Sequence, residues 1–415
     1  MKAFRTFATS LSKGGEFFIE KELKYGAHNY HPIPVVISKG SGVHLYDVGG
    51  KQYLDFLAGY SAVNQGHCHP KIVEALVQQA STLTTTSRAF HNNLLGQAEE
   101  YLCSIFNYEK ALLMNSGVEA VDSAVKIARR WAYEVKGVPD NEAVVLFPSE
   151  NFWGRSISAC ASSDDPDRYK HFGPFGGLNF EIIPYDDVSA LEKALENPNV
   201  AAFIMEPIQG EAGVKLPKDG YLKKVRELTK KKNVLMVADE IQVGIGRCGK
   251  LLACDWENVR PDMVTLAKSL SGGLLPISAV LADSQVMDVL VPGSHGSTFG
   301  GNPLACKVLQ AALDVVFEEG LIENSLKMGE LFRKGLEAQK EHFVADIRGK
   351  GLMNAIEIET KGFDAWDVCI KLAENGLLSK PTHGNIIRFT PPLVIKEKEV
   401  HQALDIIHGV LREYK

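Results

Sequence analysis

Short, uninterrupted apolar runs in the middle of the chain constrain its fold more than any other feature. Six such runs of four to six residues are separated by longer stretches, several with helical periodicity. Apolar runs that do not alternate with polar residues are typical of strands buried on both faces. Helical stretches between them imply crossover connections and a largely parallel sheet. We therefore predict an α/β domain over residues 61–306, with strands at 111–114, 143–147, 201–205, 234–238, 263–266 and 277–282 and a helix near 118–135.

The N-terminal and C-terminal parts of the chain show sequence patterns that differ from that of the middle. After Pro303 a long helical pattern runs to about residue 342, with a break expected near Gly320. The pattern then predicts a strand at 353–358, a helix at 365–375, a strand at 386–389 and a helix at 396–414. This α+β succession predicts a separate, smaller domain over residues 307–415. The N-terminal segment, residues 1–60, contains an expected hairpin turn at 48–50, and it can pack on either domain.

The composition excludes several classes of protein. Hydrophobic residues make up 45% of the 415-residue chain, which is enough apolar surface for a packed core. The longest purely apolar run is about six residues, whereas a membrane-spanning helix needs about 20, so we expect no membrane segment. The formal net charge of −6 argues against a nucleic-acid-binding surface, which needs clustered positive charge.

The cysteines and the N-terminus bear on metal content and location. No two of the seven cysteines have the C-x-x-C spacing of a metal or redox site. The adjacent His67, Cys68 and His69 cannot easily converge on one tetrahedral ion, so we expect no metal.

Residues 1–13 are basic and rich in Ser and Thr, which is typical of a short mitochondrial presequence. A frayed polar N-terminus on a cytoplasmic protein is the alternative.

Three short segments next to predicted strands hold side chains that can carry chemistry. Ser116 and Gly117 follow the strand at 111–114 and open a helix, where free backbone N–H groups can bind an anion. Asp239 ends the strand at 234–238, and Lys268 follows the strand at 263–266. Each has an ordinary alternative when taken singly, because the first two can be helix caps and most lysines are solvated.

Taken together, these segments supply the parts that pyridoxal phosphate requires. The turn at Gly117 can bind the phosphate, and a carboxylate at Asp239 can keep the pyridine nitrogen protonated. A lysine held in a dry pocket has a depressed pKa and becomes a nucleophile for carbonyl groups. The Gly- and Thr-rich loop at 296–303 can add donors to the same phosphate or be a simple turn. We therefore expect pyridoxal 5'-phosphate as the cofactor.

On residues 116–120, 239–242, 268–273 and 296–298 the chain resembles the class III pyridoxal-phosphate aminotransferases. The resemblance extends from about Phe17 to the C-terminus. It implies fold type I, an α/β fold with a large domain built on a mostly parallel seven-stranded sheet and a smaller α+β C-terminal domain. Four more stretches resemble the members of this family that act on ornithine, and the one containing Tyr30 is the most specific: residues 25–32, 60–67, 151–155 and 206–213.

The resemblance implies a role for each residue around the cofactor ring. Lys268 would hold the cofactor as a Schiff base and move a proton between substrate and cofactor. Asp239 would pair with the pyridine nitrogen, and Gln242 would contact the ring hydroxyl. Phe152 would stack on the face of the ring.

The resemblance also implies how the phosphate is bound. The backbone N–H groups of Gly117 and Val118 and the hydroxyl of Ser116 would hold it within one subunit. Thr298 would reach the phosphate of the cofactor in the neighbouring subunit. This last role implies a homodimer with shared active sites.

The substrates implied by the resemblance are L-ornithine and 2-oxoglutarate, converted to L-glutamate 5-semialdehyde and L-glutamate in a ping-pong δ-transamination. To present its terminal amine to Lys268, ornithine must have its amino acid head held away from that lysine. Tyr30 and Arg155 would do this, with Arg155 binding the carboxylate. The ordinary alternatives are a core hydroxyl for Tyr30 and a surface ion for Arg155.

A second group of residues would serve the keto acid. Arg388 would bind the α-carboxylate of 2-oxoglutarate, and Glu211 would neutralise Arg388 by an ion pair while ornithine is bound. Tyr60 would shape the pocket. A structural ion pair for Arg388 and a surface position for Glu211 are the alternatives.

Four residues depart from the family pattern. Phe299 and Leu275 stand where Tyr is usual, and Val243 and Cys248 stand where Thr is usual, so polar contacts near the site are lost.

Three alternative functions remain open. The nearest alternative is another ω-aminotransferase acting on N-acetylornithine or 4-aminobutyrate. An isomerase of the glutamate-semialdehyde aminomutase type is the second, and a non-catalytic protein on the same fold is the third.

Overall fold

The chain folds around a central seven-stranded sheet in the computed structural model, which describes residues 11–359 and 362–414. The strand order is β4-β10-β9-β8-β7-β5-β6. Strand β10 runs antiparallel to β4 and β9, whereas β9, β8, β7, β5 and β6 pair in parallel. The strands are β4 (Lys110–Met114), β5 (Val144–Pro148), β6 (Phe180–Ile183), β7 (Val200–Met205), β8 (Leu235–Asp239), β9 (Met263–Leu266) and β10 (Ser278–Ala282).

The prediction of a mostly parallel α/β sheet is confirmed, and six of the seven strands lie within one residue of their expected bounds. The sequence pattern missed β6, because this edge strand has only one buried residue, Ile183. By contrast, every residue of β5, β7, β8, β9 and β10 is buried. A strand buried on one side or at an edge leaves no continuous apolar run to find.

Two hydrophobic layers cover the two faces of this sheet. Along β7, Phe203 and Met205 pack into one layer, and Ala202 and Ile204 into the other, as the two-residue period of a strand requires. Helix α6 (Gly117–Trp131) covers the second face and continues into one π turn (Ala132–Lys136). The first face is covered by α5 (Leu95–Phe106), α10 (Tyr221–Lys231) and α12 (Pro303–Glu318).

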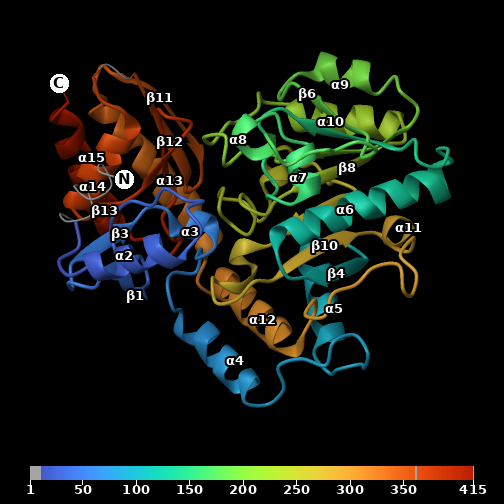
Figure 1. Ribbon diagram of the computed structural model, residues 1–415, viewed down its shortest axis with the longest axis horizontal. Coiled ribbons are helices and arrows are strands. Elements are labelled where there is room, and N and C mark those ends of the chain that lie inside the picture. The colour runs from blue at the N-terminus through green and yellow to red at the C-terminus, as the bar shows by residue number, and fades with distance from the viewer. Residues whose placement is uncertain (1–10, 360–361, 415) are drawn as a thin grey trace.

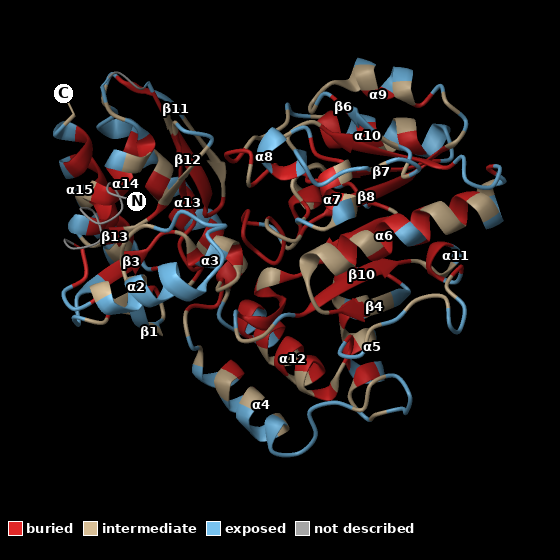
Figure 2. Cartoon of the chain, viewed as in Figure 1, coloured by how far each residue is buried: buried red, intermediate tan, exposed pale blue. Residues whose placement is uncertain are grey.

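Shorter helices complete this part of the chain: α7 (Ile157–Ala161), α8 (Pro166–Tyr169), α9 (Val188–Ala194), α11 (Ser284–Met287) and the 3₁₀ turns η2 (Ala253–Glu257) and η3 (Lys268–Ser271). Figure 2 shows the inner strands of the sheet as buried and the outer faces of α4 (Pro70–Ala80) and α2 (Glu16–Tyr25) as largely exposed. The apolar core therefore lies against both faces of the central sheet.

The N-terminal and C-terminal segments lie side by side (Figure 1). The predicted hairpin is confirmed as β2 (His44–Asp47) and β3 (Gln52–Asp55), which extend a sheet with β1 (Ile37–Ser41). Strand β3 also pairs in parallel with β13 (Leu377–Leu378). The N-terminal segment therefore packs on the C-terminal elements, and α3 (Ala58–Ser61) then leads from it into the large sheet.

The C-terminal elements form an antiparallel sheet with helices on it. Its order is β11-β12-β15-β14, built from β11 (Val344–Lys350), β12 (Met353–Ile358), β14 (Lys380–Thr382) and β15 (Ile386–Phe389). The helices are α13 (Leu321–Ala338), α14 (Ala365–Glu374) and α15 (Glu397–Arg412). The expected break is present, because Gly320 has φ of 60° between α12 and α13. The domain bounds 61–306 and 307–415 stay a prediction, since α12 runs through residue 306 without interruption.

No helix among the described residues is long and apolar enough to cross a membrane. The described residues also contain no cluster of three or more His, Cys, Asp or Glu side chains that could hold a metal ion. The expected presequence falls largely on residues 1–10, which lie outside the described residues.

One buried cation, Arg247, forms hydrogen bonds with segments in both parts of the chain. The guanidinium of Arg247 is completely buried. It donates to the backbone oxygens of Leu352 at 3.0 Å and Pro391 at 2.6 Å, and to Asn64 Oδ1 at 2.5 Å. Burial lowers the Arg247 pKa to about 10. Three separate segments therefore depend on one side chain for their hydrogen bonds.

We predict that Arg247→Ala destabilises the fold by about 3 kcal/mol or more, because several buried acceptors lose their donor at once. Urea unfolding followed by circular dichroism measures the change. The matched control is Arg130→Ala, which removes an arginine paired with Glu134 on the exposed side of α6 and should change stability by about 0.5 kcal/mol or less. Equal effects of the two substitutions would contradict the assignment.

Candidate active site

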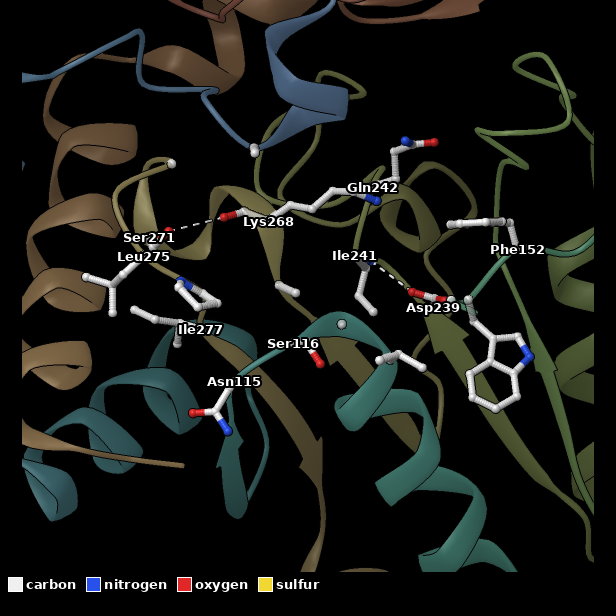
Figure 3. A pocket seen from close by; sticks show the side chains of 18 of the residues that line it. Asn115, Ser116, Phe152, Asp239, Ile241, Gln242, Lys268, Ser271, Leu275 and Ile277 are labelled. Atoms are coloured by element: carbon white, nitrogen blue, oxygen red, sulfur yellow. Dashed lines mark hydrogen bonds between the residues drawn. The ribbon is translucent and has the colours of Figure 1, made fainter. Parts of the chain in front are cut away.

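A cavity of about 610 Å³ lies at the carboxyl ends of the central strands (Figure 3). Ligands of α/β proteins bind at this edge, because loops and helix N-termini converge there. Seven of the residues expected around the cofactor line it: Ser116, Gly117, Val118, Phe152, Asp239, Gln242 and Lys268. Strands and helices far apart in the sequence thus bring the three predicted segments to one place.

The N-terminus of α6 forms one end of the cavity. Ser116 caps the helix, and it forms a capping box with Glu119. Glu119 accepts hydrogen bonds from the backbone N–H groups of Asn115 at 3.1 Å and Ser116 at 2.7 Å. Gly117 and Val118 follow as the first helical residues, whose N–H groups have no acceptor within the helix. These two amides are therefore free to bind an anion in the cavity.

Asp239 stands at the end of β8 and is buried. Its Oδ1 accepts hydrogen bonds from Ile241 N at 3.1 Å and Thr265 Oγ1 at 3.2 Å. Burial raises the Asp239 pKa to about 6, although these bonds and the charge of Lys268 oppose the rise. Both bonds end on Oδ1, so Oδ2 remains for a cationic donor in the cavity. Such a partner would bring the pKa down again.

Lys268 begins the 3₁₀ turn η3 directly after β9, and its side chain extends into the cavity (Figure 3). Burial lowers the Lys268 pKa, whereas the charges of Asp239 and Glu206 raise it. The backbone of Lys268 has φ of 48°, a left-handed conformation that costs a non-glycine residue about 1–3 kcal/mol and is concentrated at functional sites. An amine with a lowered pKa in a dry cavity is suited to act as a nucleophile.

Gln242 lies against Gly210, and this contact requires glycine. A Cβ atom added at Gly210 would stand 1.6 Å from Gln242 Oε1. The amide of Gln242 also donates to Tyr60 O at 3.5 Å. The loop at 206–213 therefore sets where the Gln242 side chain lies in the cavity.

Glu206 is the main cavity residue to which the sequence analysis gave no role. Glu206 directly follows β7, just as Asp239 ends β8. An acidic residue at the end of a predicted strand was therefore the sequence signal that could have identified it. Its oxygens accept the backbone N–H groups of Phe152 and Gly210, both at 3.1 Å. Burial and the charge of Asp239 raise the Glu206 pKa to about 8. Glu206 thus fixes the backbone of Phe152, whose side chain lines the cavity.

The residues expected at the substrate end lie around this cavity rather than on its wall. Tyr60 has φ of 60°, and its ring lies 5.1 Å from the guanidinium carbon of Arg388. Arg388 comes from β15 and is buried. Arg155 is exposed, with its guanidinium carbon 5.9 Å from the ring centre of Phe152. Tyr30 is 70% exposed. Burial raises the Tyr60 pKa, and the charge of Arg388 opposes the rise.

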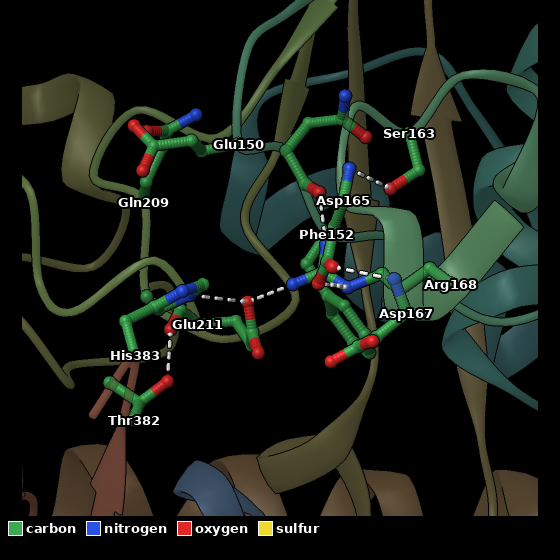
Figure 4. Close-up of polar contacts among 12 residues, drawn as sticks. Glu150, Phe152, Ser163, Asp165, Asp167, Arg168, Gln209, Glu211, Thr382 and His383 are labelled. Atoms are coloured by element: carbon green, nitrogen blue, oxygen red, sulfur yellow. Dashed lines mark hydrogen bonds and ion pairs between the residues drawn. The ribbon is translucent and has the colours of Figure 1, made fainter. Parts of the chain in front are cut away.

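Glu211 does not form the expected ion pair with Arg388. Its carboxylate instead contacts Arg168 Nη2 and lies 3.4 Å from His383 Nε2 (Figure 4). Burial raises the Glu211 pKa, but the His383 hydrogen bond and the charge of Arg168 outweigh it and bring the pKa to about 2. The sequence pattern could not reveal this, because Arg168 stands in a short polar helix with no sign of burial.

The remaining expectations concern Thr298 and the four departures from the family pattern. Thr298 is exposed and is not part of its own chain's cavity wall. Of the four departures from the family pattern, Leu275 lines the cavity and Phe299 is 57% exposed. Val243 and Cys248 are completely buried. Burial raises the pKa of the Cys248 and Cys254 thiols. A raised thiol pKa disfavours the thiolate, which is the reactive form.

Residues 25–411 match the family described as Aminotransferase class-III. The chain belongs to the class III aminotransferases. This class III aminotransferase is 58% identical over 396 residues to the mitochondrial ornithine aminotransferase of Drosophila melanogaster, covering 95% of this chain and 91% of the relative.

Solved structures agree in fold. An ornithine aminotransferase from Toxoplasma gondii has a TM-score of 0.95 at 50% identity, covering 99% and 97% of the two chains, and its description mentions PLP at the active site. An acetylornithine aminotransferase from Elizabethkingia anophelis has a TM-score of 0.88 at 52% identity, covering 97% and 100%.

The cofactor of this class III aminotransferase is pyridoxal 5'-phosphate, and the cavity fits it. Free amides of Gly117 and Val118 suit the phosphate, and the open oxygen of Asp239 suits a protonated ring nitrogen. The Lys268 amine lines the same cavity. At Gly117 a Cβ atom would meet Ile241 Cδ1 at 3.1 Å, so glycine also keeps this end of the cavity open.

We predict a pH dependence of stability that arises from Glu206. Between the ordinary pKa of 4.5 and about 8, the folded cofactor-free protein binds more protons than the unfolded chain. Stability therefore falls as pH rises through this window. Glu206→Gln should flatten that part of the profile, which urea unfolding of the cofactor-free protein at pH 5 and pH 8 measures. Identical slopes for the two proteins would show that Glu206 is ionised throughout.

Proposed function

We propose that the protein is an ornithine aminotransferase, which moves the δ-amino group of L-ornithine to 2-oxoglutarate. The observation that carries this proposal is the placement of Lys268 and Asp239 in one cavity beside the buried guanidinium of Arg388. The high identity to a relative named for this activity supports the choice of substrate. The products are L-glutamate 5-semialdehyde and L-glutamate.

The cofactor supplies an electron sink for the carbon from which a proton is removed. Lys268 would hold the cofactor, and its amine would take that proton from the substrate carbon and return it. Asp239 would keep the ring nitrogen protonated, and Gln242 would contact the ring hydroxyl. Phe152, fixed through its backbone by Glu206, would stack on the face of the ring.

The two substrates place their carboxylates on different arginines. Arg155, on the exposed side of Phe152, receives the carboxylate of ornithine, with Tyr30 beside it. Arg388 receives the α-carboxylate of 2-oxoglutarate. Tyr60 lies against Arg388 and would shape this subsite. The distance of the ornithine head from Lys268 then selects the δ-amine for reaction.

We further propose a homodimer with shared active sites. The exposed position of Thr298 supports this, because the hydroxyl cannot serve the cavity of its own chain. Phe90 and Phe299 are 74% and 57% exposed, and exposed large aromatic side chains are typical of interfaces. A mitochondrial location is supported by the name of the Drosophila melanogaster relative and by the basic residues 1–13.

We predict that Lys268→Ala lowers kcat by at least about a hundredfold, because both covalent attachment and proton transfer are lost. Borohydride reduction of the wild type, followed by mass spectrometry, should attach the cofactor to the peptide that contains residue 268. In Lys268→Ala no peptide should carry it. A variant with normal turnover, or a reduced cofactor on another lysine, would overturn the role of Lys268.

The substrate assignment is tested with amines one at a time. We expect turnover with L-ornithine that requires added 2-oxoglutarate, and at least about tenfold lower kcat/KM with N-acetylornithine and 4-aminobutyrate, because neither presents a free amino acid head to Tyr30 and Arg155. The similarity to the Elizabethkingia anophelis enzyme makes N-acetylornithine the decisive comparison. Preference for N-acetylornithine would replace the proposal, and product formation without keto acid would indicate an isomerase.

A further inference from the structure

Arg168 is a buried cation beside the Phe152 ring, and the proposed mechanism does not use it. It lies on α8 and is 4% exposed. Its Nη1 donates to Asn151 O at 2.7 Å, its Nε pairs with Asp165 at 3.0 Å, and its Nη2 contacts Glu211. Its guanidinium carbon is 4.9 Å from the ring centre of Phe152. These contacts restrain the orientation of the guanidinium, although its Nε makes no hydrogen bond among the described residues.

Glu211 is held from both sides by this arrangement. Arg168 approaches its carboxylate from α8, and His383 approaches from the loop after β14 (Figure 4). Thr382 Oγ1 also donates to the backbone oxygen of Glu211 at 2.9 Å. Helix α8 and the end of β14 with its following loop therefore meet on this one residue.

Arg388, by contrast, has no carboxylate within ion-pairing distance among the residues that the structure describes. Its Nη1 donates to Gly210 O at a long 3.3 Å, and its Nε is buried without a hydrogen-bond partner. A buried guanidinium without an anion is costly. A ligand carboxylate would therefore stabilise the charge of Arg388. The carboxylate of Glu211 would do the same if it were released from Arg168.

We propose that Arg168 is a positioning residue that sets specificity: by holding Glu211, it keeps Arg388 available for the carboxylate of a dicarboxylic keto acid. This rests on the proposed function, in which Arg388 receives 2-oxoglutarate. Arg168 and Arg388 compete for one carboxylate, so the strength of the Arg168–Glu211 pair sets how much of the enzyme is ready for the keto acid. Without Arg168, Glu211 turns to Arg388 and occupies the subsite.

The test uses the cofactor-loaded protein and glutarate, which has both carboxylates of 2-oxoglutarate but no keto group. Isothermal titration calorimetry gives its Kd for the wild type, Arg168→Gln, Glu211→Gln and the double variant. We expect Arg168→Gln to raise the Kd about tenfold, in the range of coupled neighbouring charges. Glu211→Gln should bind at least as tightly as the wild type, and the double variant should bind like Glu211→Gln.

The double variant separates positioning from other roles. If Arg168 acted only by packing on Phe152, or by attracting glutarate directly, the double variant would bind as weakly as Arg168→Gln, and the proposal would be overturned. An unchanged Kd in Arg168→Gln would overturn it as well. Arg168→Lys, which keeps the charge, should restore most of the affinity. Arg130→Gln, on the exposed side of α6, is the matched control and should leave the Kd unchanged.

Steady-state kinetics give a second readout. In Arg168→Gln the KM for 2-oxoglutarate should rise about tenfold, while the rate of the half-reaction with ornithine stays within about twofold. Equal losses in both half-reactions would contradict a role specific to the keto acid. If the wild type does not turn over ornithine, the proposed function fails, whereas the glutarate comparison still decides the role of Arg168.

Discussion

The structure depends on burying three ionisable groups, Asp239, Glu206 and Lys268, at one edge of a parallel sheet. None of the three has an ion pair within 4 Å among the described residues, and burial shifts the pKa of each toward its neutral form. Backbone N–H groups offset part of this cost at the two carboxylates. The remainder is offset when a cofactor with an anionic phosphate and a cationic ring nitrogen fills the cavity.

This requirement explains the local backbone around the cavity. Lys268 and Tyr60 both have left-handed conformations, with φ of 48° and 60°. Gly210 leaves room for the Gln242 side chain, which a Cβ atom would displace. Strained and closely packed positions of this kind persist only where the surrounding structure determines them. The buried strands β7, β8 and β9 provide that support, because each packs between two hydrophobic layers.

The sequence was sufficient for the parts of the molecule that depend on local pattern. Continuous apolar runs revealed the buried strands, and residues at their carboxyl ends revealed Asp239 and Lys268. Edge strand β6 lacks an apolar run, so it was not predicted. The pairing of β3 with β13 joins residues more than 300 positions apart, which no local pattern encodes. The same limit applies to Glu211, whose partners Arg168 and His383 are set by the packing of two sheets.

The buried carboxylate of Asp239 should be stabilised by the positive charge of a protonated cofactor ring. The most direct measurement is the free energy of unfolding of wild type and Asp239→Asn at pH 8, each with and without pyridoxal phosphate. The account predicts that the cofactor-free variant is at least as stable as the wild type, because a buried charge is removed, and that the cofactor stabilises it much less. Equal stabilisation of the two proteins by the cofactor would contradict the account.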